Sequence, residues 1–241
     1  FFLGTLVAAS ALLFVVVLLG RSLRKASIAI GSLLLTTILL IANLTGLFFP
    51  EVPVTGLNPE KEMSLALTEA SLQGTIRESR WSAFGRTDLV EFPQRPGEMR
   101  LYVDGTAGTP MYRFNGNLNA PDEEVSRLRE KFTGYFPFFF LSPAQKNNAL
   151  LIGSGGGRDI LLALMGGMES ITAVEVNRDI IDIIRDYSWY NGGITTNFNS
   201  VKVVAEEGRN FLKRQRESYD LIMLSLPVTQ TSRSLEGFSL T

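Results

Sequence analysis

The sequence contains no cysteine and no histidine among its 241 residues, and these absences exclude several kinds of site. Without cysteine there is no disulfide, no thiolate nucleophile and no zinc–thiolate centre in this stretch. Without histidine there is no imidazole general base, no Ser-His-Asp triad and no histidine metal ligand. Acid–base chemistry here must therefore use Asp, Glu, Lys, Tyr or the substrate itself.

Acidic residues are absent from residues 1–49, which hold only three basic residues, Arg21, Arg24 and Lys25. The rest of the sequence has 20 basic and 24 acidic residues, so its formal net charge is -4. A nucleic-acid-binding surface needs a basic excess, and we expect no nucleic-acid partner. The sequence starts inside an apolar run and stops just after a predicted strand. We expect it to be part of a longer protein, incomplete at its C-terminus.

Two runs without charged residues, 1–19 and 26–49, follow one another. As helices they would extend about 28 and 36 Å, enough for a hydrocarbon core of about 30 Å. The alternatives are a signal peptide, which needs a basic segment before its apolar core, and a buried helical hairpin. We expect two transmembrane helices within residues 1–49, and hence an integral protein of the inner or plasma membrane.

The basic segment Gly20-Arg-Ser-Leu-Arg-Lys25 lies between these two runs. The positive-inside rule places such a loop in the cytoplasm, which would leave residue 50 onward outside. The nucleotide-type site described below, however, takes ligands that are cytosolic, and upstream helices could outweigh one loop. We therefore expect the soluble part to be cytoplasmic.

Residues 50–80 are predicted to form a linker, because three prolines and a glycine come first and a polar stretch follows. One helical segment is expected within it, around residues 60–73. A small antiparallel β unit is predicted for residues 81–118, with three or four strands. The Asp104-Gly105 dipeptide between two of its apolar runs is typical of a hairpin turn.

Residues 119–241 alternate between helix and strand patterns. Strands are predicted at residues 148–152, 171–176, 201–205 and 220–224, and helices at residues 122–133, 158–165, 178–187 and 208–216. Such alternation is typical of βαβ units and a parallel sheet. The sequence thus predicts an α/β fold in which a Rossmann-like domain, incomplete at its end, follows the β unit.

A glycine-rich segment, Leu150-Leu-Ile-Gly-Ser-Gly-Gly-Gly-Arg-Asp159, joins the first of these strands to the next helix. Glycine lets the backbone turn tightly and approach a ligand; the alternative is a turn that binds nothing. A dinucleotide fingerprint starting at Gly153 needs its third glycine at position 158, which is Arg158. The G-x-G-x-G of Gly153, Gly155 and Gly157 instead resembles the first motif of S-adenosylmethionine-dependent methyltransferases, whose ligand is a nucleoside without pyrophosphate.

Two acidic positions fit the same edge of the sheet. Glu175 ends the second strand, 22 residues after Gly153, where doubly wound sheets hold ribose hydroxyls. Glu207 follows the third strand, where its carboxylate could accept from an adenine amino group. The alternative for Glu207 is a solvated acid at a helix start, favoured by the helix dipole. For Asp159 we favour that alternative.

The order of motifs resembles spermidine synthase, the polyamine aminopropyltransferase family, and most of all its membrane-bound members. The motifs are the segment from Trp81 to Glu91, Leu101-Tyr-Val-Asp-Gly105, the glycine segment, Val174-Glu-Val-Asn177, Glu207-Gly-Arg-Asn-Phe-Leu212 and Tyr219-Asp-Leu-Ile-Met223. The likeness covers residues 81–228. It implies a β unit packed on a methyltransferase-type sheet, and a homo-oligomer.

The resemblance also implies roles for individual residues. Gly153, Ser154, Gly155 and Gly157 would surround the methionine-derived tail of the donor. Glu175 would bind the ribose. Glu207 and Gly208 match the family's acidic pair next to adenine, and Asp104 matches an acid of its β unit. The donor would be decarboxylated S-adenosylmethionine, a co-substrate and not a tightly bound cofactor, and no metal is implied.

Two positions depart from the family pattern. The family's loop carries an Asp that holds the donor's amine, and this chain has Gly156 there. After the fourth strand the family has two carboxylates that bind the attacking amine, whereas this chain has Ser225 at the first position and none at the second. A dicationic acceptor needs one neutral, positioned amine beside an anionic wall, so another acid would have to substitute. Candidates are Asp104, Glu206 and Asp159.

Three functions remain open on these residues. The first is a membrane-tethered aminopropyltransferase acting on a diamine or polyamine such as putrescine. The second is an S-adenosylmethionine-dependent methyltransferase, and the third a non-catalytic nucleoside-binding module of a membrane protein. In each of them we expect Glu175→Ala to abolish nucleoside binding with little change in the fold.

Overall fold

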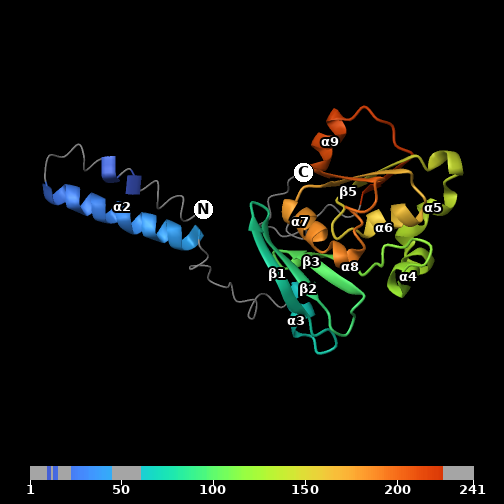
Figure 1. Ribbon diagram of the computed structural model, residues 1–241, viewed down its shortest axis with the longest axis horizontal. Coiled ribbons are helices and arrows are strands. Elements are labelled where there is room, and N and C mark those ends of the chain that lie inside the picture. The colour runs from blue at the N-terminus through green and yellow to red at the C-terminus, as the bar shows by residue number, and fades with distance from the viewer. Residues whose placement is uncertain (1–9, 12, 16–22, 45–60, 225–241) are drawn as a thin grey trace. The chain divides into compact units, whose positions relative to one another are not determined.

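The computed structural model describes residues 10–11, 13–15, 23–44 and 61–224, and the chain forms two compact units, Phe1–Val54 and Thr55–Thr241. In the first unit, helix α2 spans Leu23–Leu44 (Figure 1). The hydroxyls of Ser10 and Thr36 lie 2.7 Å apart, so the first apolar run contacts the second. Among the described residues, no helix combines the length and the apolarity needed to span a membrane.

The second unit begins with helix α3, Glu62–Thr68, and a four-stranded antiparallel sheet in the order β1-β2-β3-β4. The strands are β1 (Thr75–Ser82), β2 (Gly85–Glu91), β3 (Glu98–Val103) and β4 (Thr106–Tyr112). The predicted antiparallel unit with its turn at Asp104-Gly105 is thus present. Its first strand, β1, begins within the predicted linker 50–80. That strand escapes sequence reasoning because it is mostly polar and exposed on one face.

Between the two sheets the chain forms four short helical elements. They are α4 (Glu123–Lys131), η1 (Thr133–Tyr135), α5 (Pro137–Phe140) and η2 (Pro143–Gln145). Burial of Val125 and Leu128 attaches α4 to the core. In the aromatic segment that follows, Phe138 is buried while Phe139 stays exposed.

The second sheet is parallel, in the order β7-β6-β5-β8. Its strands are β5 (Asn148–Ile152), β6 (Ser170–Glu175), β7 (Val201–Ala205) and β8 (Leu221–Leu224). The connecting helices are α6 (Arg158–Met165), α7 (Arg178–Asp186), α8 (Ser188–Asn191) and α9 (Gly208–Arg214). The strand order reverses between β5 and β8. Ligands of open α/β sheets bind outside the carboxyl ends of the strands at such a switch point.

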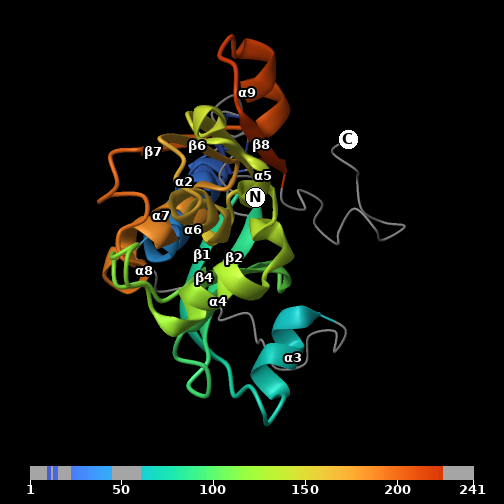
Figure 2. The ribbon, with the colours of Figure 1, turned by 90° about the vertical axis from the view of Figure 1, so that its right-hand side faces the viewer.

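The two sheets enclose a layer of helices. One cluster of buried side chains joins Leu89 and Leu101 of the antiparallel sheet to Ile160 of α6, Ile183 of α7 and Leu151 of β5. The opposite face of the parallel sheet buries a smaller cluster against α9. Figure 2 shows this succession from α9 through the parallel sheet and α6 to the antiparallel sheet and α3. The β unit therefore packs onto the helix layer that carries the glycine-rich segment.

Candidate functional site

The glycine-rich segment makes a tight turn from β5 into α6. Gly153, Gly155 and Gly157 have φ angles of 75°, 49° and 90°, which residues other than glycine rarely adopt. The turn is held by Gly153 N–H donating to Val174 O at 2.9 Å and by Gly157 N–H donating to Ser154 O at 3.0 Å. Ser154 is buried within it. The spacing of these glycines thus follows from the geometry of the turn.

Glu175 lies at the end of β6 with its side chain turned toward this loop. Oε2 accepts from Gly155 N–H at 3.0 Å and Oε1 accepts from Asn177 N–H at 3.0 Å. The side chain is 7% exposed, so both bonds lie in a largely desolvated position. The structure therefore brings together the loop and the acid that the sequence placed at one site, and a carboxylate retains further lone pairs for ligand hydroxyls.

Strand β4 of the antiparallel sheet covers the loop from one side. Thr109 Oγ1 accepts from Gly156 N–H at 2.8 Å. A side chain at position 156 would begin 2.2 Å from Pro110 O, and one at position 155 would begin 2.4 Å from Thr109 Oγ1. Gly156, the first departure from the family pattern, is therefore required by β4, which leaves no space there for a carboxylate.

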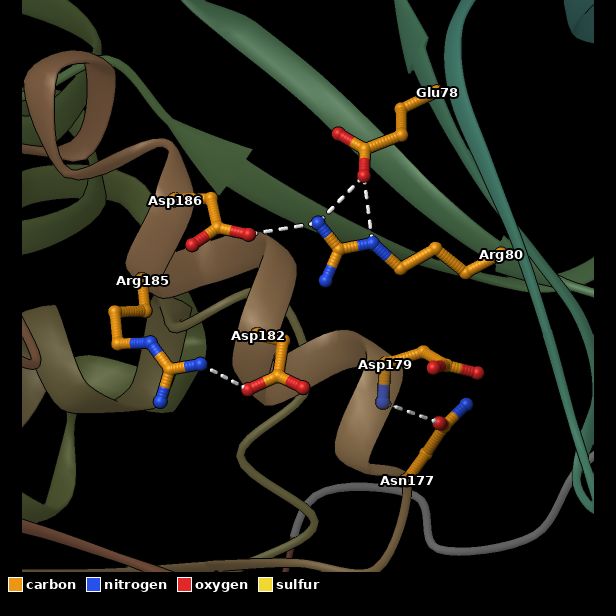
Figure 3. Close-up of polar contacts among 7 residues, drawn as sticks. All are labelled: Glu78, Arg80, Asn177, Asp179, Asp182, Arg185 and Asp186. Atoms are coloured by element: carbon orange, nitrogen blue, oxygen red, sulfur yellow. Dashed lines mark hydrogen bonds and ion pairs between the residues drawn. The ribbon is translucent and has the colours of Figure 1, made fainter. Parts of the chain in front are cut away.

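The turn after Glu175 is fixed to both sheets through Asn177, which is 3% exposed. Its Oδ1 caps α7 by accepting from Asp179 N–H at 3.0 Å, as Figure 3 shows. Its Nδ2 donates to Thr87 Oγ1 of β2 at 2.9 Å. A second link in Figure 3 joins β1 to α7 through the ion pair of Arg80 with Asp186, at 2.8 Å. The β unit thus contacts the turn that carries the ribose-binding candidate.

Glu207 and Gly208 mark the start of α9 at the same edge. The Glu207 carboxylate accepts from Arg209 N–H at 3.0 Å and from Asn210 N–H at 2.9 Å, so it is the N-cap of the helix. These backbone hydrogen bonds lower the pKa of Glu207 below its ordinary value. A side chain at position 208 would begin 2.5 Å from Ile152 Cγ2, so glycine allows α9 to start close to β5.

The remaining acidic candidates have structural partners. Asp104 Oδ1 accepts from Arg86 N–H at 2.9 Å in the β3–β4 turn, where Asp104 has a φ of 49°. Glu206 pairs with Arg214, and its own N–H donates to Glu175 O at 3.1 Å. Asp159 is buried beside Arg158, with Oδ1 3.4 Å from Nε. The geometry therefore places the backbone of Glu206 next to that of Glu175, whereas Asp104 lies in the β3–β4 turn. Ser225 lies outside the described residues.

Sequence reasoning assigned no individual role to Thr87, Thr109 or Asn177. Asn177 carried a detectable signal, because an Asn directly before a helical pattern and two residues before an Asp is a typical N-cap. The two threonines carried none, since only the docking of the antiparallel sheet brings Thr109 to the loop and Thr87 to the turn after Glu175. Among the described residues, no group of three or more acidic side chains is arranged to hold a metal ion.

No protein-family model matches the chain. Curated polyamine aminopropyltransferases from Buchnera aphidicola subsp. Acyrthosiphon pisum, strains Tuc7, 5A and APS, are each 32% identical to it over 79 residues. That match covers 32% of this chain and 27% of each relative. The chain thus spans about a quarter of the length of these curated relatives, and the likeness is to one segment of an aminopropyltransferase.

The solved structures that match the chain include the following three. A spermidine synthase in complex with the transition state analogue AdoDATO has a TM-score of 0.44 at 19% identity, over 62% of this chain and 47% of that one. The spermidine synthase of Thermotoga maritima has a TM-score of 0.44 at 20% identity, with the same coverage of 62% and 47%. A probable spermidine synthase of Corynebacterium glutamicum ATCC 13032 has a TM-score of 0.45 at 15% identity, over 64% and 52%.

Proposed function

We propose that this chain is a spermidine synthase-like aminopropyltransferase that transfers the aminopropyl group of decarboxylated S-adenosylmethionine to a diamine such as putrescine. The observation that carries the proposal is the Glu175 carboxylate held against Gly155 N–H at the carboxyl end of β5 and β6. The curated aminopropyltransferases that share a 79-residue segment with the chain support it.

The reaction forms one bond and breaks one. A neutral amine nitrogen of the acceptor attacks the aminopropyl carbon bound to the sulfonium, and the carbon–sulfur bond breaks with its electron pair going to sulfur. The products are the elongated amine, which loses one proton, and methylthioadenosine. Catalysis here depends on holding donor and acceptor in line, with the acceptor's other charge balanced by an anion.

The described residues divide this task. The glycine loop follows β5, beside the switch point between β5 and β8, and Glu175 ends the neighbouring strand β6. Together they would bind the nucleoside and aim its sulfonium. Glu207 and Gly208 lie along the adjoining strand end, where the adenine would rest. Glu206 is the acid we assign to the acceptor, because its backbone contacts Glu175 while its side chain is only 18% exposed.

Product analysis by mass spectrometry tests the proposal. The full-length protein in detergent receives decarboxylated S-adenosylmethionine and a mixture of putrescine, cadaverine and spermidine, with Glu175→Ala as matched control. We expect an aminopropylated amine and an equal amount of methylthioadenosine from the wild type, and neither from the control. Methylthioadenosine binding without any product would contradict aminopropyl transfer.

One observation favours the alternatives of a methyltransferase or a non-catalytic nucleoside-binding module. Pro110 O occupies the space that a carboxylate at position 156 would need to hold the donor's amine. Such a site would bind the nucleoside thioether but would have no carboxylate at position 156 to bind the donor's amine. Intact S-adenosylmethionine and a panel of methyl acceptors, supplied to the same sample, distinguish methyl transfer from binding alone.

We further propose that the chain is tethered to the inner or plasma membrane with residues 61–224 on the cytoplasmic side. The apolar side chains that α2 exposes, among them Leu34 and Ile38, support this proposal, as does the Ser10–Thr36 contact. These 241 residues contain no cysteine, so a single thiol introduced among them can be labelled at a known place in this chain. In Ser82→Cys, where the replaced residue is exposed, a membrane-impermeant maleimide should label the thiol only after cells are permeabilised. Labelling of intact cells would contradict this orientation.

A further inference from the structure

The antiparallel sheet contacts the glycine loop and the turn after Glu175, the two parts of the candidate nucleoside site, through two threonine hydroxyls. Thr109, on β4, contacts the glycine loop, and Thr87, on β2, contacts the turn after Glu175. These strands are separated in the sheet by β3, so the two contacts lie on different strands of one rigid sheet. Neither contact belongs to the glycine motif or to the acidic positions considered above.

Thr109 accepts the N–H of Gly156, which donates neither to the parallel sheet nor to the rest of the loop. Gly153 and Gly157 donate to carbonyls of the sheet and the turn, and Gly155 donates to Glu175. Gly156 N–H instead donates to Thr109 Oγ1 at 2.8 Å, and Gly156 is buried. A valine at position 109 would keep the shape of threonine but leave this buried amide without an acceptor, so the loop would shift to find one.

Thr87 acts on Glu175 through Asn177. Thr87 is fully buried, and its hydroxyl accepts from Asn177 Nδ2 at 2.9 Å. Asn177 in turn donates its backbone N–H to Glu175 Oε1. The orientation of the ribose-binding candidate therefore depends on a side-chain contact with a strand of the other sheet.

We propose that Thr109 and Thr87 are positioning residues, through which the β unit sets the distance between the glycine loop and Glu175 and so the affinity for the nucleoside. This inference rests on the nucleoside site of the proposed function but not on the transfer reaction. It assigns the β unit a role in donor binding. The sequence alone does not indicate this role, because Thr109 lies 47 residues before the loop residue that it contacts.

The β4 strand is itself anchored on its outer side. Glu62 Oε2 of α3 accepts from Gly108 N–H at 2.9 Å, and Met63 N–H donates to Gly105 O at 3.0 Å. Lys61 Nζ donates to Asp104 O at 2.8 Å. Strand β4 is thus fixed at one end by α3 and contacts the loop in its middle, which gives the Thr109 hydroxyl a defined place.

The test compares Thr109→Val with Thr109→Ser in the full-length protein. The first readout is the affinity for methylthioadenosine by calorimetry. The second is the hydrogen-exchange rate of the Gly156 amide in the ligand-free protein, measured by mass spectrometry with fragmentation. Thr106→Val is the matched control, because Thr106 lies on the same strand and its hydroxyl donates to Val103 O at 3.1 Å, away from the loop.

We expect Thr109→Val to weaken methylthioadenosine binding by about three- to tenfold and to speed exchange of the Gly156 amide. Thr109→Ser should restore both values, and Thr106→Val should leave both unchanged. Thr87→Val and Thr87→Ser should behave like the corresponding Thr109 variants in affinity, which keeps the test independent of any folding defect at one position.

Wild-type affinity together with wild-type exchange in Thr109→Val would overturn the inference, whether or not the protein forms an aminopropylated product. Equal losses in Thr109→Val and Thr106→Val would also overturn it, because they would show a general effect of weakening β4. Weakened binding in a protein that yields no product would instead support the inference while contradicting the proposed transfer. The two proposals can therefore fail separately.

Discussion

At the scale of single residues, Glu175 combines a structural and a binding role. Its carboxylate accepts two backbone N–H groups in a position only 7% exposed. We predict that Glu175→Ala lowers methylthioadenosine affinity by at least tenfold and lowers the free energy of unfolding by about 1–3 kcal/mol, because two buried donors lose their acceptor. Calorimetric titration and urea denaturation measure the two effects.

This prediction revises the expectation that Glu175→Ala would leave the fold almost unchanged. The sequence placed an acid at a strand end but did not show that its oxygens face inward to two amides. Glu175→Gln is the matched variant, because its amide keeps one oxygen acceptor at nearly the same size. Unchanged nucleoside affinity in Glu175→Ala would contradict the proposed site, and unchanged stability would contradict the structural role.

Gly156 gives a second prediction at this scale. A side chain there would begin 2.2 Å from Pro110 O, which is backbone and cannot rotate away. We predict that Gly156→Asp displaces β4, lowers the free energy of unfolding by about 2 kcal/mol or more and weakens nucleoside binding. It should therefore not recreate an amine-binding carboxylate. Thermal unfolding and calorimetric titration test this.

Gly167→Ala is the control for Gly156→Asp. Gly167 has a φ of 75°, but among the described residues nothing beyond its own chain neighbours lies within 4 Å of the place that a Cβ would take there. Its substitution therefore adds backbone strain without a clash. The expected cost is about 1 kcal/mol, with nucleoside affinity unchanged. A Gly156→Asp protein of wild-type stability that binds decarboxylated S-adenosylmethionine more tightly would contradict the role given to position 156.

At the scale of elements, α9 depends on its N-cap. The backbone N–H groups of Arg209 and Asn210 lower the pKa of Glu207 below its ordinary value of 4.5. A group whose pKa is lowered by folding stabilises the native state above its unfolded pKa, and this contribution disappears as pH falls through the lower folded value. We predict an acid-range loss of stability below pH 4.5 that Glu207→Gln removes.

Urea denaturation at a series of pH values between about 6 and 2 measures this effect, with the midpoint of the Glu207 carboxyl resonance as a direct readout. The resonance should titrate below the value of an unstructured glutamate. A midpoint at or above that value would contradict the capping geometry.

The elements that sequence reasoning located are those with strong local patterns. Helix α7 buries Ile180, Ile183 and Ile184, a spacing that marks one helical face, and β5 is a short apolar run directly before glycine. Strand β1 was missed because its pairing with β2, and not its own apolar pattern, makes it a strand. Local periodicity thus predicts amphipathic elements better than polar edge strands.

Only those parts of the candidate site that have a local sequence pattern could be predicted. The glycine spacing and the acid at the end of β6 are local signals, so the contact between Gly155 and Glu175 could be expected. The contacts of Thr109 and Thr87 arise from the docking of one sheet on the helix layer of the other, which no local pattern encodes. The lack of space for a side chain at position 156 arises from the same docking. The sequence therefore shows that Gly156 differs from the family pattern, but not why.

At the scale of the whole molecule, the shared core predicts that the two sheets unfold together. One buried cluster contains Leu101 of β3 and Leu151 of β5, so neither sheet keeps its core without the other. Trp81 lies on β1 and Trp189 on α8, which supplies one fluorescent probe in the antiparallel sheet and one in the helix layer. The single-tryptophan variants Trp189→Phe and Trp81→Phe should give coincident denaturation curves.

The fluorescence midpoints of these two variants test whether the two sheets unfold together. Each midpoint is compared with that of far-ultraviolet circular dichroism on the same variant. Coincident midpoints support a single cooperative unit. An earlier transition at Trp81 alone would contradict it, because it would show that the β unit separates from the parallel sheet first. It would also weaken the role given to Thr109 and Thr87.

The central claim is that a nucleoside binds between the glycine loop and Glu175, and a crystal structure of the full-length protein with methylthioadenosine tests it most directly. We predict ligand density at the carboxyl ends of β5 and β6, with the ribose hydroxyls within hydrogen-bonding distance of the Glu175 carboxylate. Density confined to the cavity of about 610 Å³ beside Phe139 and Arg129, or no ligand at saturating concentration, would contradict the claim.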